Sequence, residues 1–171
     1  NLMSMTDGHL LFKQSLRNIG LQPAIDLEFS VSRVGRQTQA EIQNSVSSKV
    51  RQILLLAKSL ETASRFSTLL PKETKEILNQ QPQLEEFLSQ DVLTQIPIQI
   101  QLILLTLPLT NYFSDKNINF IKTNKARLIN GFISDYDLSS ITNNVLKYKN
   151  VGELTNTLEK AQERIKSICS Q

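Results

Sequence analysis

Arg33 is the side chain in this sequence with the clearest potential for chemistry on phosphate groups. It follows an apolar segment of strand type, Ala24 to Val31, and is itself followed by Val34 and Gly35. A guanidinium stays protonated and presents paired donors that match phosphate oxygens, so an arginine at a strand end can stabilise charge on a transferred phosphoryl group. On spacing alone, a surface arginine paired with a carboxylate is the more common interpretation.

The sequence has no phosphate-binding loop of the type Gly-x-x-x-x-Gly-Lys-Ser/Thr, and it has no glycine between Arg36 and Asn130. We therefore expect that this protein alone binds no nucleotide cofactor and cannot hydrolyse ATP. Its one histidine, His9, and its one cysteine, Cys169, cannot form a Cys/His metal constellation or an internal disulfide. No metal site is expected.

Composition excludes two further classes of partner. The 19 Lys and Arg against 16 Asp and Glu give a net charge of +3, and the basic residues are scattered, so we expect no nucleic-acid binding. The most apolar stretch, Ile96 to Leu109, is interrupted by polar residues and by Pro108, and it is shorter than the roughly 20 residues that span a bilayer. It predicts a buried helix.

The first thirty-five residues differ in character from the rest. They hold three of the five glycines and two short segments of strand type, residues 1–6 and 24–31, with a turn predicted at Asp7-Gly8. Leu10 to Ile19 is compatible with a short strand or a helical turn. Two strands bury too little surface to be stable alone, so we expect something else to complete this sheet. The sequence begins at Asn1 within a predicted strand, without an initiator methionine or a signal sequence, and we expect it to be a fragment.

From residue 36 onward, apolar residues recur at spacings of three and four, which predicts helices. The first is long and amphipathic, and it should end near Leu70 because Pro71 cannot continue it. Its apolar stripe consists of Ile42, Val46, Val50, Ile53, Ala57 and Leu60. Two shorter helices are predicted at 71–79 and 82–89, since proline suits the first turn of a helix.

Three more helices complete the predicted bundle. An apolar helix starts at Pro97, with Thr94 as its candidate cap and a kink or break at Pro108. A second covers 118–133. The last carries a single stripe, which consists of Val151, Leu154, Leu158, Ala161, Ile165 and Ile168. The predicted fold class is therefore mainly α: a helical bundle preceded by a short strand-containing segment.

Two strings of residues carry a resemblance to a known family. Residues 1–8 read Asn-Leu-Met-Ser-Met-Thr-Asp-Gly, and residues 23–35 read Pro-Ala-Ile-Asp-Leu-Glu-Phe-Ser-Val-Ser-Arg-Val-Gly. They resemble Asn-Val-Ile-Ser-Ile-Thr-Asp-Gly and the Arg-Pro-Ala-Ile…Ser-Val-Ser-Arg-Val-Gly segment of F-type ATP synthase alpha subunits, at the family's separation. The similarity continues more faintly, without a gap, to the C-terminus.

The resemblance implies that residues 1–35 are the end of a nucleotide-binding domain and residues 36–171 the C-terminal helical domain. It places Arg33 at the arginine that reaches across the subunit interface into the catalytic site of a beta subunit, a role known as an arginine finger. Ser4 corresponds to a hydroxyl that faces the same phosphate site. The ATP or ADP and the Mg²⁺ then belong to the full complex.

Alpha subunits of this family also bind a non-catalytic nucleotide, and the resemblance places residues of its adenine pocket at Gln22, Pro23, Gln90 and Val92. Gln22 replaces an arginine and Val92 replaces a glutamine, so stacking on the base and hydrogen bonding to it are expected to be weaker. We therefore expect a degraded adenine site.

The implied partners are the beta subunits, the remainder of the alpha subunit and the gamma rotor subunit. The implied location is peripheral to an energy-transducing membrane, whether a bacterial plasma membrane, a mitochondrial inner membrane or a plastid thylakoid, with membrane contact only through the complex. An alternative function is a non-catalytic helical scaffold or adaptor derived from an alpha subunit.

Overall fold

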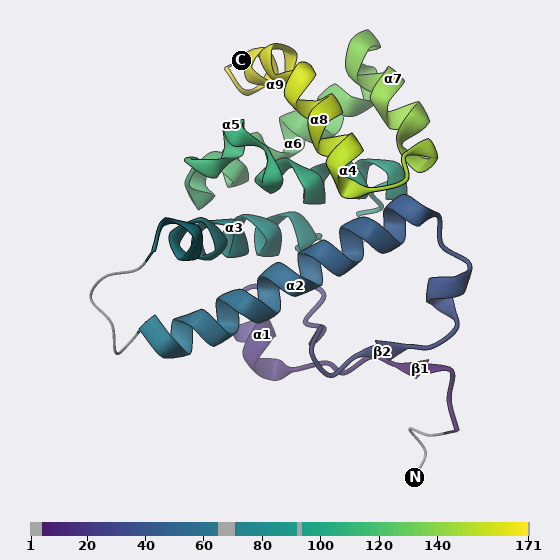
Figure 1. The fold of residues 1–171 in the computed structure, drawn as a ribbon, viewed down its shortest axis with the longest axis vertical. Helices are drawn as coiled ribbons and strands as arrows, with labels where there is room; N and C mark the ends of the chain where they lie inside the picture. Colours follow the sequence, from purple (N-terminus) through teal and green to yellow (C-terminus); the bar gives the residue numbers. More distant parts are fainter. Residues whose placement is uncertain (1–4, 65–70, 92–93, 171) are drawn as a thin grey trace.

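The computed structural model describes residues 5–64, 71–91 and 94–170. The long helix α2 divides the molecule, with the N-terminal segment on one side and α3 to α9 on the other (Figure 1). The elements are β1 (Gly8–His9), α1 (Gln14–Asn18), β2 (Val31–Ser32), the 3-10 helix η2 (Gly35–Gln37), α2 (Glu41–Ser64), α3 (Lys72–Leu88), α4 (Ile98–Thr106), η3 (Leu107–Leu109), α5 (Asn111–Ser114), α6 (Ile118–Ser134), α7 (Tyr136–Asn144), η4 (Val145–Lys147), α8 (Val151–Lys160) and α9 (Gln162–Cys169). The prediction of a mainly helical fold with a short strand-containing segment is confirmed.

The N-terminal segment contains less strand than predicted. Strands β1 and β2 pair antiparallel over two residues each, with Gly8 opposite Ser32 and His9 opposite Val31. One further antiparallel bridge joins Phe12 to Ile25. The predicted strand over 24–31 is wrong in its extent, because Asp26 closes a turn over the residues that follow it. The predicted strand over 1–6 lies largely outside the described residues.

Helix α2 confirms the apolar stripe read from the sequence. Five of its six members, Ile42, Val46, Val50, Ile53 and Ala57, are at most 4% exposed, and Leu60 is partly exposed. The helix starts at Glu41, one residue before the first member of the stripe, and η2 with the bend after it occupies residues 35–39. Its predicted end near Leu70 lies outside the described residues.

Helix α3 corrects the prediction of two short helices on either side of Pro82. It runs unbroken from Lys72 to Leu88 with Pro82 inside it. A proline in a helix interior removes one backbone hydrogen bond and costs about 3 kcal/mol. The residues that follow it offset this cost, since Gln83, Leu84 and Phe87 are 1%, 0% and 3% exposed in the core.

Helix α4 is buried on most of its circumference, with Ile100, Leu102, Ile103 and Leu104 all in the core. The prediction at Pro108 is confirmed, since the α-helix ends at Thr106 and Pro108 lies in η3. The predicted cap is wrong. Pro97 is the N-cap residue, and the Thr94 amide donates to the Asp91 carbonyl at 3.1 Å.

Helices α6 and α7 meet at a short turn that Asp135 stabilises. The predicted helix over 118–133 is confirmed as α6, with Asn117 as its N-cap. The Asp135 carboxylate caps α7 by accepting the amides of Asp137 and Leu138, and it also pairs with Arg164, its Oδ2 lying 2.5 Å from that residue's Nη2. This pair ties the start of α7 to α9.

The C-terminal stripe is confirmed, but the single terminal helix is wrong. Leu154, Leu158 and Ile165 are at most 2% exposed, yet the helix breaks at Ala161 into α8 and α9. Backbone angles of −86° and 6° at Ala161 redirect the backbone, and α9 then packs against α6. The spacing of the apolar residues does not indicate this break, because the spacing of three and four continues across Ala161.

Candidate functional site

Arg33 lies directly after β2, and its side chain is exposed. Its backbone amide donates to the Asp7 carbonyl at 2.8 Å, which continues the β1–β2 pairing by one more hydrogen bond. The backbone thus holds Arg33 at the end of β2, and the residue as a whole is exposed. Such an arrangement can present a guanidinium to a group outside this part of the protein.

Gly8 permits the close pairing that fixes this strand end. A Cβ at Gly8 would lie 2.5 Å from the Val31 carbonyl oxygen and 3.1 Å from the Ser32 Cα. Both are backbone atoms, so neither can move aside without separating the strands. A glycine at this position is what lets β1 approach β2.

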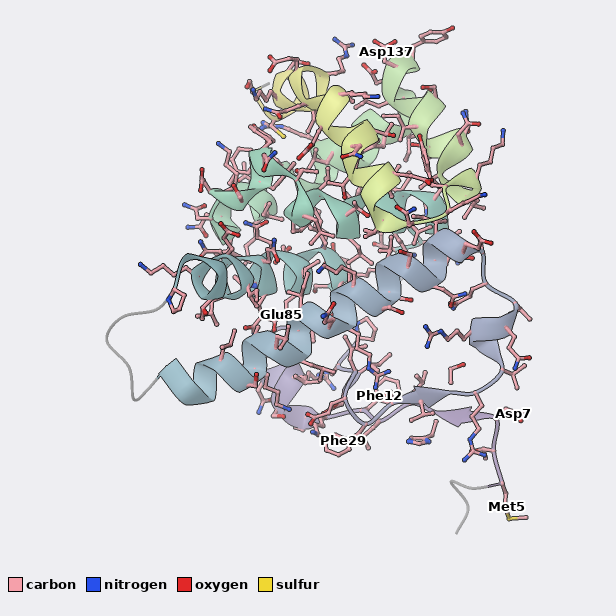
Figure 2. All side chains as sticks on the ribbon, viewed as in Figure 1. Met5, Asp7, Phe12, Phe29, Glu85 and Asp137 are labelled. Atoms are coloured by element: carbon pink, nitrogen blue, oxygen red, sulfur yellow. The ribbon has the colours of Figure 1, made fainter. Side chains whose placement is uncertain are left out.

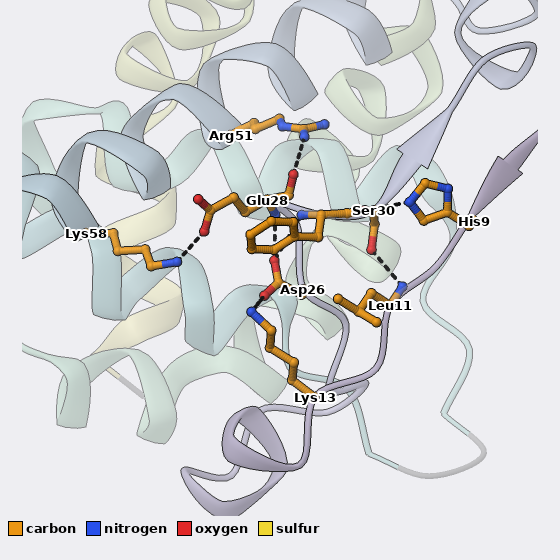
Figure 3. Close-up of polar contacts among 9 residues, drawn as sticks. His9, Leu11, Lys13, Asp26, Glu28, Ser30, Arg51 and Lys58 are labelled. Carbon is orange, nitrogen blue, oxygen red and sulfur yellow. Dashed lines mark hydrogen bonds and ion pairs between the residues drawn. The ribbon is translucent and has the colours of Figure 1, made fainter. Parts of the chain in front are cut away.

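A buried carboxylate organises the segment before β2. Asp26, which is 7% exposed, is paired with the Lys13 ammonium and accepts the backbone amides of Glu28 and Phe29 at 2.8 and 3.1 Å (Figure 3). The hydrogen bond from Lys13 is the largest cause that lowers the pKa of the Asp26 carboxyl, while burial opposes it. The charged carboxylate thus closes the turn from which β2 starts.

This lowered pKa predicts a pH-dependent loss of stability. A carboxyl whose pKa is lower in the folded state contributes stability above its unfolded value of about 3.9, and this contribution is lost as pH falls through the folded pKa. We expect Asp26→Asn to be less stable than the parent at pH 7, with a difference that shrinks below about pH 4. Thermal unfolding at pH 7 and pH 3 measures this, with Asp115→Asn, an exposed aspartate outside the turn, as control. A difference that is the same at both pH values would contradict it.

The residues predicted for the adenine pocket lie together. The Gln90 amide donates to the Gln22 carbonyl at 2.7 Å, and Gln22, Pro23 and Gln90 line one open hollow of about 430 Å³. Ser4 and Val92, the other residues predicted for the two nucleotide sites, lie outside the described residues. The structure does not bring Arg33 into this hollow, so the two predicted sites are separate.

Sequence reasoning missed two side chains that line the same hollow. Phe12 and Arg17 reach it from the bridge to Ile25 and from α1. An aromatic ring and a guanidinium are groups on which a planar base can stack. No pattern in the sequence predicted a role for them, because their position depends on how the backbone of residues 12–24 turns back on itself.

Two general features bear on the chemistry. Within residues 5–64, 71–91 and 94–170, no group of three or more His, Cys, Asp or Glu side chains could hold a metal ion. In the same ranges, no helix is both long enough and apolar enough to cross a membrane.

Comparison with known proteins gives consistent matches. Residues 39–167 match the family model described as ATP synthase alpha/beta chain, C terminal domain. An ATP synthase subunit alpha from Clostridium botulinum (strain Hall) is 30% identical over 169 residues, which are 98% of this chain and 33% of that protein. ATP synthase subunit alpha from Salinibacter ruber is 32% identical, over 71% of this chain and 22% of its own length. ATP synthase subunit alpha 1 from Mycoplasmopsis pulmonis is 34% identical, over 79% and 26%.

The sequence thus spans a third or less of the length of these curated relatives. The family match falls wholly within the predicted helical domain, and the longest relative match extends through the strand segment as well. The protein belongs to the family of C-terminal domains of ATP synthase alpha and beta subunits, and it corresponds to the C-terminal portion of an alpha subunit.

Proposed function

We propose that this protein is part of the alpha subunit in the catalytic head of a rotary, proton-translocating ATP synthase, and that Arg33 acts there as an arginine finger for a neighbouring beta subunit. The relatives that carry the name ATP synthase subunit alpha support the assignment to the head. The observation that carries the catalytic part is the exposed Arg33 at the end of β2, held by the bond from its amide to the Asp7 carbonyl.

The chemistry of this role follows from the charge that phosphoryl transfer develops. Charge grows on the oxygens of the terminal phosphate, and a guanidinium presented from another subunit offsets it with two parallel hydrogen bonds. The nucleotide and its Mg²⁺ are bound in the full complex, where the metal supplies further charge neutralisation. Catalysis then depends on how closely the subunit interface closes around Arg33. Ser4 is proposed to place its hydroxyl at the same phosphate site.

A second, weaker nucleotide contact is proposed at the hollow of Gln22, Pro23 and Gln90. Its amide groups can hydrogen-bond an adenine edge, and Arg17 can compensate in part for the arginine that Gln22 replaces. The proposed site is non-catalytic, and we expect it to bind adenine more weakly than the family pattern would.

Exposed apolar side chains on the N-terminal segment support its docking onto the remainder of the alpha subunit. Met5, Leu10, Phe12, Ile19 and Phe29 are 83%, 63%, 64%, 70% and 52% exposed. Figure 2 shows Met5, Phe12 and Phe29 on the segment that α2 separates from the upper helices. A contiguous exposed apolar patch marks an interaction site in soluble proteins, and we propose that these side chains contribute to one. Beta subunits and the gamma rotor are the other proposed partners, with the complex peripheral to an energy-transducing membrane.

Native mass spectrometry of the protein isolated from its source tests the assignment to the head. We expect it in an assembly of several hundred kilodaltons that contains beta subunits, because the arginine finger requires a second subunit to supply the nucleotide. A monomer without beta subunits would contradict the proposal and favour the helical scaffold.

A further inference from the structure

Glu28 connects the segment before Arg33 to the long helix of the bundle. Its carboxylate forms an ion pair with the Lys58 ammonium, and its backbone carbonyl accepts a hydrogen bond from Arg51 Nη2 at 3.2 Å (Figure 3). Arg51 and Lys58 are about two turns apart on α2 and therefore share a face of that helix. We call Glu28, Arg51 and Lys58 the α2 anchor.

The backbone is tied to the same helix again after Arg33. The Arg36 carbonyl accepts from the Asn44 side-chain amide at 3.1 Å, and Arg36 Nη2 donates to the Ser48 hydroxyl at 3.3 Å. Arg33 therefore lies on a stretch whose two ends, Glu28 and Arg36, are both attached to α2. Between them, the contacts of Ser30 with Leu11 and of Arg33 with Asp7 are made within the N-terminal segment itself.

These contacts give the α2 anchor a specific consequence. The pairing of β1 with β2 fixes Arg33 relative to the rest of the N-terminal segment. It does not fix Arg33 relative to the helical domain. The anchor and the tie at Arg36 lie close to Arg33 in the sequence and join its segment to α2. The hydrogen bond from the Gln90 amide to the Gln22 carbonyl joins the segment to the helical domain farther from Arg33. The path from Glu28 to Arg33 is short, and it ends in the hydrogen-bonded residues 31–33. A shift at Glu28 is therefore passed to Arg33.

We propose that Glu28 is a positioning residue for Arg33, which lets helix α2 set where the guanidinium stands at the neighbouring subunit's nucleotide. This rests on the proposed arginine-finger role. Glu28 touches no substrate and acts through Arg33. The ion pair couples motion of the helical domain to the strand that carries the catalytic arginine.

Steady-state turnover of the assembled complex tests the positioning role. The side chains of Lys58 and Glu28 are 61% and 41% exposed, so solvent screens the pair and its effect is moderate. We expect Glu28→Gln to lower kcat about two- to five-fold with KM unchanged, because Arg33 acts on the transition state. Reversing the pair with Glu28→Lys and Lys58→Glu should restore kcat. In an Arg33→Ala background, Glu28→Gln should cause no further loss.

Glu163→Gln is the matched control, because it removes the carboxylate of another exposed ion pair, that of Glu163 with Lys166 on α9. It should leave kcat at the parent value. Three outcomes would each overturn the positioning role. The first is a parent-like kcat for Glu28→Gln, and the second is a further loss of kcat when Glu28→Gln is added to the Arg33→Ala variant. The third is a kcat that does not recover when the charges of the pair are reversed. If Arg33→Ala alone has parent turnover, the proposed function fails and the positioning role with it; a normal Arg33 effect beside an inert Glu28 rejects the positioning role alone.

Discussion

Arg33→Ala is expected to lower ATP turnover of the assembled complex by about 10³–10⁵-fold, while the complex still forms. The side chain is exposed at the end of β2, so its removal leaves the packing of the helical core unchanged. In the proposed role, the variant loses a guanidinium that offsets the charge developing on the terminal phosphate. Turnover under saturating ATP and native mass of the same preparation measure the two halves of this prediction.

Two further variants sharpen the test at Arg33. Arg33→Lys keeps a positive charge but loses the planar fork, so we expect it to recover only a small part of the lost rate. Arg127→Ala removes an exposed arginine from α6, far along the sequence from the proposed interface, and should turn over at the parent rate. Parent-like turnover of Arg33→Ala would reject the arginine finger, whatever the behaviour of the other two variants.

Gln83→Leu is expected to destabilise the folded protein by about 1–3 kcal/mol. Gln83 is 1% exposed, and its Nε2 donates to the carbonyls of Phe113 and Lys116 at 2.9 and 2.6 Å. These bonds join α3 to the end of α5 and the turn after it. Leucine fills nearly the same volume but donates nothing. The Phe113 carbonyl then keeps the backbone amide of Lys116, at 3.1 Å, and the Lys116 carbonyl loses the Gln83 donor. Thermal unfolding should show a melting temperature lower by roughly 2–12 °C.

Gln83→Glu separates the loss of donors from a change in shape. Its carboxylate would face the two carbonyl oxygens without a proton to donate, so we expect a larger loss at pH 7 than for leucine. Burial raises the pKa of such a carboxyl in the folded state, so stability should recover as pH falls and the group gains a proton. Gln81→Leu is the control, since the Gln81 side-chain amide donates to the Glu85 carboxylate on its own helix. Equal melting temperatures for Gln83→Leu and the parent would contradict the role of these bonds.

Periodicity predicted the helices well where one face meets the core over several turns. Most members of the stripe of α2 are buried, and those of the C-terminal segment are buried or partly buried against the core, because a spacing of three and four residues brings side chains to one side of a helix. The same local rule failed at Pro82 and at Ala161. There, packing of Leu84 and Phe87 outweighs the cost of the proline, and contact of α9 with α6 bends a stripe that remains continuous in sequence.

The sequence by itself determined the chemical identity of the candidate site. Only an arginine at the strand end offers paired, permanently charged donors, and the flanking residues carried the family resemblance that gave it a role. Tertiary structure alone decided what surrounds it: that Glu28 meets Lys58 across 30 positions, and that Phe12 and Arg17 share a hollow with Gln90. Contacts between residues far apart in sequence depend on how whole elements pack against one another. A local pattern of residue types does not determine which distant residues come into contact.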